Sequence, residues 1–284
     1  MISILKFLRK LFSTSPPAAP SAKSKQPKTS PGSERTLAEV IDRLKPLAKP
    51  CVRITAKDLQ LPFAKDPLPL TASKFGGRPY LPRGESYPVD KRGRAMVLLA
   101  QINLSEVTGL PELPEAGLLQ IFVNPIFEDI DYEPTVIYRT EQQITAPTAD
   151  SVRFPPVIFD YFYFETVHEL SFAPAIDPGN LEDETFGQGV QKLLSGWLSD
   201  KGYERIADDL YDHFSNGGHQ IGGYAEFTQS DPRKPNTPAG YQLLQMDSKD
   251  GIMIGDAGLI HVFLDPTTIK PGRISGGWFY WDCC

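Results

Sequence analysis

Residues 98–103 read Leu-Leu-Ala-Gln-Ile-Asn, and residues 243–247 read Leu-Leu-Gln-Met-Asp. Both stretches are apolar except for a glutamine and a polar last residue, and both are short, which is typical of a buried β-strand. A second apolar stretch follows each of them and opens on a glycine, Gly117 in one case and Gly258 in the other. The chain therefore carries two similar pairs of expected strands.

A glycine pair precedes each of these strand pairs. Gly76-Gly77 stands before the first and Gly222-Gly223 before the second, and the matching positions are separated by 146, 144 and 141 residues along the chain. Glycine pairs, strand glutamines and apolar positions have separate physical causes, so their agreement in order is informative. We predict an internal duplication with copies near residues 73–140 and 219–282, and an α+β fold of mostly antiparallel β-sheet in two similar half-sheets.

Helical spacing of apolar residues predicts three helical stretches. Thr36 and Glu39 form a capping box at the start of the first, which Pro46 and Pro50 should end. The other two form a helical hairpin over residues 186–214, between the two copies. Short apolar runs bounded by Pro, Gly, Asp or Asn predict strands at residues 97–102, 118–123, 136–139, 157–166, 242–246, 259–264 and 278–281.

Residues 1–13, MISILKFLRKLFS, have the pattern of a basic amphipathic helix. The segment is shorter than the roughly 20 residues that cross a bilayer, so we expect it to lie on an anionic membrane surface. A transit peptide and a start without any role are the alternatives. The residues expected to contact the membrane are Ile4, Leu5, Phe7, Leu8, Leu11 and Phe12 on the apolar face and Lys6, Arg9 and Lys10 on the basic face.

Composition divides the chain into a basic tail and an acidic body. Residues 14–33 consist almost entirely of Pro, Ser, Thr, Ala and Lys, which predicts a disordered linker and leaves residues 34–284 as the folded domain. Residues 1–35 carry a net charge of +6 while the whole chain carries −6, so the remainder carries −12. An acidic body repels phosphate backbones, which excludes nucleic acid as an expected partner.

The three cysteines have no zinc-binding spacing and form no even disulfide framework. A reducing compartment fits this usage best. We therefore expect a cytoplasmic protein that lies on the inner face of the membrane.

The sequence contains no phosphate-binding loop, dinucleotide fingerprint, nucleophile elbow, paired-histidine metal helix or Cys-x-x-Cys motif. We therefore expect no cofactor and no metal. A cleft between the two copies could still gather polar side chains, in which a histidine and several carboxylates would act as acid–base groups. The candidates for this cleft are Gln101, Asn103, His219, Gln229, Asp231, Gln245, Asp247 and Asp256.

Several of these residues also have a structural interpretation. The glycine pairs suit turns as well as ligand-facing loops. Gln101 and Gln245 lie inside apolar strands, so their amides either bind neighbouring backbone or point into the cleft. Asp256 suits a tight turn, and His219 suits the end of the preceding helical hairpin.

Several separated motifs occur in a fixed order along the chain: Phe75–Pro82, Leu98–Leu104, His219–Tyr224 with Gln229–Asp231, Leu243–Asp247 and Gly255–Gly258. Together they resemble the YwqG-like family, an uncharacterised and mainly bacterial domain family. The resemblance covers the chain from about Thr36 to the end, and the basic N-terminal segment is not part of the family pattern. It implies a bacterial, cytoplasmic α+β protein rich in antiparallel sheet, with no established catalytic residues or substrate.

These observations favour a non-catalytic binding or interaction module that is peripherally associated with a membrane and has an unknown protein partner. The alternative is a hydrolase-like or metal-dependent enzyme that uses the carboxylate and histidine cleft. A third hypothesis is a structural protein whose acidic face captures a basic partner.

Overall fold

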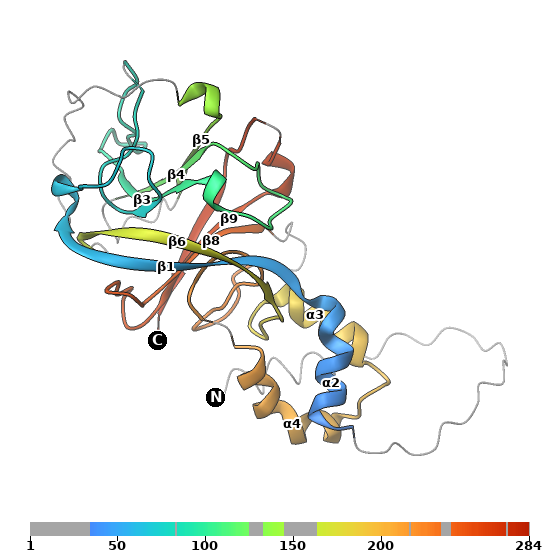
Figure 1. The fold of residues 1–284 in the computed structure, drawn as a ribbon. Helices are drawn as coiled ribbons and strands as arrows, with labels where there is room; N and C mark the ends of the chain where they lie inside the picture. Colours follow the sequence, from blue (N-terminus) through green and yellow to red (C-terminus); the bar gives the residue numbers. More distant parts are fainter. Residues whose placement is uncertain are drawn as a thin grey trace.

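The structure is a computed structural model, shown in Figure 1. The expected amphipathic helix at residues 1–13 and the linker at residues 14–33 lie outside its described part, as do residues 157–163 of the expected strand 157–166. The described residues are 35–82, 84–124, 133–144, 164–215, 217–233, 240–270 and 272–283.

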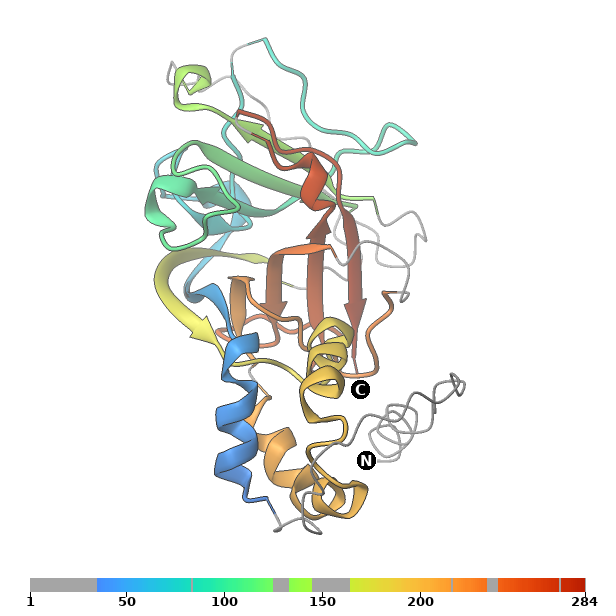
Figure 2. The same cartoon turned by 90° about the vertical axis from the view of Figure 1, so that its right-hand side faces the viewer.

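The α-helices of the described part of the chain lie beside one end of the sheet, as Figures 1 and 2 show. They are α2 (Leu37–Leu44), α3 (Glu184–Leu194) and α4 (Asp200–His213). Their apolar faces pack against one another in a separate core, which includes Val40, Phe186 and Leu210. The predicted first helix and the helical hairpin are therefore confirmed as elements of the fold.

The N-terminus of α2 has the predicted capping box. The Glu39 N–H donates to Thr36 Oγ1, and the Thr36 N–H donates to Glu39 Oε2 at 2.8 Å. The α-helix ends at Leu44, and a turn of 3₁₀-helix over Lys45–Leu47 holds Pro46 near its start, where a missing N–H is tolerated.

Within the residues that the structure describes, ten strands form one antiparallel sheet in the order β10-β9-β8-β7-β1-β6-β2-β3-β4-β5. The sheet curls, so that the strands at its two ends approach each other in Figure 1. Val136 of β5 and Phe279 of β10 accordingly contribute to the same main core. The strands are β1 (Lys49–Pro62), β2 (Lys74–Phe75), β3 (Val97–Asn103), β4 (Leu118–Val123), β5 (Thr135–Arg139), β6 (Thr166–Asp177), β7 (His219–Gly222), β8 (Tyr241–Asp247), β9 (Leu259–Leu264) and β10 (Trp278–Asp282).

Six of the predicted strands are present, each within one residue of its expected bounds; they are β3, β4, β5, β8, β9 and β10. The expected strand at residues 157–166 overlaps an observed strand only at Thr166, where β6 begins. The long strands β1 and β6 were otherwise not predicted. They pair with each other at the middle of the sheet and divide it into a first outer group, β2–β5, and a second outer group, β7–β10.

The two outer groups have the same strand register. In the first, Gln101 pairs with Gln120, and the ladder shifts register at Leu99. In the second, Gln245 pairs with His261, and the ladder shifts register between Gln242 and Leu244. The chain crosses over at the centre of the sheet. β1 precedes β2 along the chain but pairs with β7, and β6 precedes β7 but pairs with β2.

Candidate functional site

Each glycine pair forms a left-handed turn at the start of an outer group. The φ angles are 65° and 77° in Gly76-Gly77 and 71° and 70° in Gly222-Gly223. A residue with a Cβ adopts this conformation only at a cost, whereas glycine adopts it freely. The glycines therefore let the chain turn sharply as it leaves β2 and β7.

A buried carboxylate lies against each turn. Asp66 Oδ2 accepts hydrogen bonds from the Arg78 N–H at 2.8 Å and from Lys74 Nζ at 2.7 Å. Asp177 Oδ2 accepts the Tyr224 N–H at 2.9 Å. Burial lowers the pKa of Lys74, and the neighbouring carboxylate of Asp66 partly offsets this by favouring the charged lysine. These acidic side chains fix the backbone just after each glycine pair.

The strand glutamines bind the same two loops from the other side. Gln101 Oε1 accepts the Tyr80 N–H, and Gln245 Oε1 accepts the Glu226 N–H, both at 2.9 Å. Tyr80 and Glu226 each stand three residues after a glycine pair. The Nε2 group of each glutamine donates to backbone carbonyls, and both side chains are fully buried. Both amides thus hold loops in place and do not reach solvent.

Asn103 and Asp256 lie in local turns. Asn103 Oδ1 accepts the Ser105 N–H at 3.2 Å and caps a turn of 3₁₀-helix. Asp256 is exposed in a turn that the Gly258 N–H closes by donating to the Ile254 carbonyl at 2.7 Å. Nothing in these contacts joins the two side chains to the other candidates.

Gln229 and Asp231 lie near the C-terminal strand and α3. Gln229 Nε2 donates to the Cys283 carbonyl at 2.7 Å. Asp231 accepts the N–H of Glu184 at 2.9 Å, at the first turn of α3, and forms an ion pair with Arg233. Their hydrogen bonds connect parts of the fold.

Three of the eight candidates converge at the entry to β7. The Asp247 N–H donates to His219 Nδ1 at 2.9 Å, and Asp247 Oδ2 accepts the Gly218 N–H at 2.7 Å. Gln245 Nε2 donates to the Gly218 carbonyl at 3.0 Å. His219 thus lies in a strand and binds the end of β8, and does not cap the helical hairpin.

Two acidic residues outside the candidate set, Glu226 and Asp250, complete this cluster. Glu226 Oε1 accepts from Ser215 Oγ at 3.1 Å, and burial raises the pKa of the Glu226 carboxyl. Asp250 Oδ2 accepts the Ala56 N–H at 3.2 Å and lies 3.8 Å from His219 Nε2. Neither residue belongs to a motif in the sequence, and only the three-dimensional crossing of the strands brings them to His219.

The ring of His219 is buried and hydrogen-bonded to the backbone. Because Nδ1 accepts the N–H of Asp247, the proton of the neutral ring resides on Nε2. Burial lowers the pKa of His219 to about 4, and only 1% of the residue is exposed. A general base needs an available lone pair within reach of its substrate. The lone pair of this ring is occupied by a backbone N–H in the interior.

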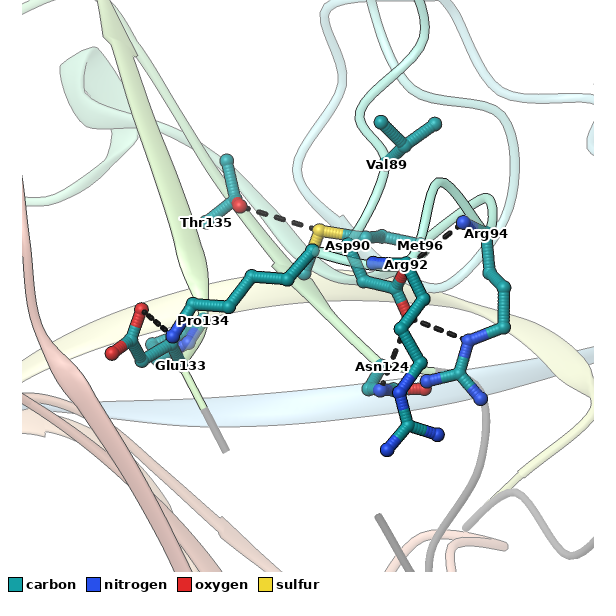
Figure 3. Close-up of a pocket in the computed structure, with 10 residues that line it drawn as sticks. Val89, Asp90, Arg92, Arg94, Met96, Asn124, Glu133, Pro134 and Thr135 are labelled. Carbon is teal, nitrogen blue, oxygen red and sulfur yellow. Dashed lines mark hydrogen bonds and ion pairs between the residues drawn. The ribbon is translucent and has the colours of Figure 1, made fainter. Parts of the chain in front are cut away.

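A small pocket of about 130 Å³ lies at the hairpin before β3, beside the beginning of β5. Figure 3 shows the side chains that line it. Asp90 Oδ1 accepts the N–H groups of Arg92 and Arg94, at 2.9 and 2.8 Å, and its Oδ2 accepts Arg94 Nε at 2.6 Å. Thr135 Oγ1 donates to the Met96 sulfur at 3.2 Å. Sequence patterns did not indicate this pocket, since its residues form no motif.

Among the residues that the structure describes, no group of three or more His, Cys, Asp or Glu side chains is arranged to hold a metal ion. None of the helices in the described part of the chain has the length and apolar character needed to span a bilayer.

A ten-stranded antiparallel sheet with a layer of helices at one end defines an α+β protein. The family described as a domain of unknown function (DUF1963) matches residues 73–283 of the chain, which is well over half of its length. The protein belongs to this family. The matched stretch begins just before β2 and so contains both outer groups and β6. No curated protein is significantly similar to the chain.

Proposed function

We propose that this protein is a non-catalytic binding module that residues 1–13 attach to an anionic membrane surface. The protein would be a cytoplasmic, bacterial relative of YwqG-like proteins, as the family resemblance implies. The module would sit on the inner face of the membrane and present its acidic body to a protein partner.

The burial and hydrogen bonding of His219 support a non-catalytic role. His219 is the candidate best suited to acid–base chemistry, and its Nδ1 accepts a backbone N–H at 2.9 Å while the ring is buried. The strand glutamines beside it are likewise hydrogen-bonded to backbone. Polar groups used in this way build a scaffold, whereas a catalytic group must contact its substrate.

We also propose that the two outer groups descend from one duplicated segment. Support comes from the matching register shifts in β3–β4 and β8–β9 and from the equivalent bonds of Gln101 and Gln245. The strand order is also symmetric about the β1–β6 pair. A duplicated scaffold with a helical insertion before β7 would explain why the two glycine-pair loops are built alike.

Flotation on vesicles tests the membrane part. The full chain should float with vesicles rich in phosphatidylglycerol, and a chain that lacks residues 1–33 should not. Replacing Lys6, Arg9 and Lys10 by Gln removes roughly 1 kcal/mol of attraction for each charge and should lower partitioning on the order of a hundredfold.

Matched control variants distinguish membrane binding by an amphipathic helix from membrane binding by positive charge alone. Replacing Lys23, Lys25 and Lys28 by Gln removes the same charge from the linker and should lower partitioning less. Replacing Leu8 and Leu11 by Ser leaves the charge unchanged and should abolish flotation, because it removes buried apolar area. Equal flotation of all these chains would exclude an amphipathic anchor.

A further inference from the structure

His168 of β6 is fully buried, and both nitrogens of its ring lie against backbone carbonyl groups. Nδ1 is 2.9 Å from the Thr166 carbonyl oxygen, and Nε2 is 3.1 Å from the Asp250 carbonyl oxygen. A carbonyl oxygen only accepts hydrogen bonds, and a neutral imidazole has a single N–H to donate. The neutral ring would therefore leave one nitrogen lone pair facing an oxygen, whereas the imidazolium satisfies both contacts.

A carboxylate is placed to balance a positive charge on this ring. Asp58 pairs with His168 across the β1–β6 ladder, so the two side chains leave the same face of the sheet. A Cβ on Gly251 would lie 3.1 Å from Asp58 Oδ2 and 3.5 Å from His168 Nε2, so both groups border the same turn. Burial raises the pKa of the Asp58 carboxyl, but hydrogen bonds from neighbouring groups and the nearby His168 lower it below its ordinary value. An ionised carboxylate beside a buried imidazole favours the protonated ring.

His219 of β7 and the loop after β8 also face His168. The Nδ1 atom of His219 accepts the Asp247 N–H, so its ring is neutral. Burial is the main cause of the low pKa of His219, and the nearby Lys249 and His168 lower it further. Lys249 is exposed, and Asp250 presents its carbonyl to His168. A charge on His168 is therefore compatible with a neutral His219 beside it.

Apolar groups surround the rest of the His168 ring. Phe75 of β2 pairs with His168 across the ladder. The ring of Phe164 meets the imidazole edge to face, with the ring centres 5.4 Å apart and an angle of 89° between the planes. In such surroundings water does not replace a missing hydrogen bond, so the two carbonyl contacts decide which protonation state fits.

The segment that His168 holds is the β8–β9 loop, residues 248–258. Asp250 and Gly251 turn this loop with left-handed φ angles of 56° and 91°. A residue other than glycine adopts such a φ only at a cost, so Asp250 depends on tertiary contacts. Its carbonyl contacts His168 of β6, and its carboxylate accepts the Ala56 N–H of β1 at 3.2 Å. The two central strands together thus fasten the turn of the loop.

We propose that His168 is an imidazolium at neutral pH, that it fastens the β8–β9 loop to the centre of the sheet, and that a rise in pH releases this contact. The neutral ring keeps its proton on Nδ1, whose contact with the Thr166 carbonyl is the shorter one and lies within the strand. The contact that is lost is then the one between Nε2 and the Asp250 carbonyl. The stabilising contribution of His168 is present at low pH and is lost as the pH rises through the range in which the folded ring loses its proton.

Long-range ¹H–¹⁵N spectra of the ¹⁵N-labelled full chain test the protonation state. At about pH 7 His168 should carry a proton on both nitrogens, while His219 in the same spectrum carries one. As the pH is raised to about 9, His168 should lose its Nε2 proton. The amide signal of Gly251, whose nitrogen shares a peptide group with the Asp250 carbonyl, should shift with the same midpoint. A His168 ring with one proton at about pH 7, or a Gly251 amide that does not follow the ring, would overturn the proposal.

Asp58→Asn tests the source of the charge balance. The variant removes the carboxylate but keeps an oxygen that can accept the Gln60 N–H, which Asp58 Oδ1 accepts at 2.7 Å. His168 should then lose its proton at a pH lower by about one unit or more. Glu169→Gln is the matched control, because it removes the same charge from the next residue of β6, which is exposed and points to the other face. An equal shift in both variants would contradict the role of Asp58.

His168→Gln tests the release of the loop. Its side chain does not titrate, so the Gly251 amide should no longer shift between about pH 7 and 9. A Gly251 amide that still shifts as in the wild type would show that another group moves the loop, and the proposal would be wrong. The titration of the wild-type chain needs no substitution, so it decides the protonation state of His168 even where a variant does not fold.

Discussion

Gln120 and His261 occupy the same register position in the two outer groups. Gln120 pairs with Gln101, and its Nε2 donates to Gln101 Oε1 and to the Tyr80 carbonyl, both at 2.9 Å. His261 pairs with Gln245, but neither ring nitrogen of this fully buried histidine makes a well-formed hydrogen bond with a described residue, and the backbone of Glu226 is the polar group nearest the ring. The first outer group therefore binds its buried polar side chain with two close hydrogen bonds, which the second outer group does not reproduce at His261.

His261→Gln should stabilise the protein. The new amide can repeat the bonds of Gln120 with Gln245 Oε1 and the Glu226 carbonyl, and a buried hydrogen bond contributes about 1 kcal/mol net. The gain is offset in part by lost ring contacts with Phe227 and Phe263. Urea unfolding should show a rise of about 1 kcal/mol in the free energy of unfolding. Gln120→His, the reverse exchange, should lower it, and a loss of stability in His261→Gln would contradict the equivalence of the two positions.

Alanine at the second glycine of each pair should be costly. A Cβ on Gly77 would lie 2.6 Å from Asp66 Oδ2, and one on Gly223 would lie 2.5 Å from Asp177 Oδ2. Gly276 has a similar φ of 76° with nothing within 4 Å of its Cβ position, so Gly276→Ala isolates the backbone term of about 1–2 kcal/mol. Chemical denaturation should show larger losses for Gly77→Ala and Gly223→Ala, similar to each other. Equal losses in all three variants would argue against the two carboxylate contacts.

Lys74→Met should strongly destabilise the protein, because it leaves the Asp66 carboxylate buried without its ionic partner. Both side chains of this pair are fully buried at 2.7 Å. Breaking such a pair from one side costs about 3–5 kcal/mol. Lys74→Gln should cost less, since it introduces the residue found at the matching position, where Gln220 Nε2 lies 3.5 Å from Asp177 Oδ2. Unfolding free energies that rank the two variants in the opposite order would contradict this account.

The two buried histidines should lower the stability of the protein as the pH decreases from about 6.5 toward 4. Burial lowers the pKa of His219 to about 4 and that of His261 to about 3 from an ordinary value of 6.5. In this range the unfolded chain binds protons that the folded chain does not, so acid favours unfolding. Each histidine can contribute on the order of 3 kcal/mol. His261→Gln should show a smaller loss than the wild type between pH 6.5 and 4.5, and parallel curves would show that His261 does not contribute.

The outer strands could be predicted because their own residues make them recognisable. Leu118–Val123 and Leu259–Leu264 are apolar runs, each interrupted by one polar residue, Gln120 or His261, and all of their residues are buried. The helices have capping residues and one apolar face, which is also a local signal. Elements of this kind can be predicted from the residues within a short window of sequence.

The central strands carried no comparable signal. β1 begins with Lys49-Pro50, ends at Pro62 and contains Arg53 and Lys57, and its burial changes along its length as it passes from the interior to an exposed end. Its pairing with β7 joins segments separated by about 170 residues, which no local pattern specifies. The grouping of His219 with Asp250 depends on such pairings and could not be predicted from spacing.

The candidate residues also combine a property that the local sequence shows with one that depends on the tertiary fold. The sequence identified Gln101 and Gln245 as unusual because they are polar within apolar strands, and it left open whether they point into a cleft or bind backbone. The choice between these depends on Tyr80 and Glu226, whose N–H groups reach the glutamines only after the glycine pairs turn the chain. Side-chain direction is a tertiary property.

The protonation of His219 tests most directly whether the polar cluster at the centre of the protein is structural. Long-range ¹H–¹⁵N correlation spectra of the histidine rings should show a neutral His219 with the proton on Nε2 and an unprotonated Nδ1 from pH 8 down to about pH 5. A His219 ring that titrates near pH 6.5 and carries its proton on Nδ1 would mean that the imidazole is open to solvent and to a substrate, and the non-catalytic account would be wrong.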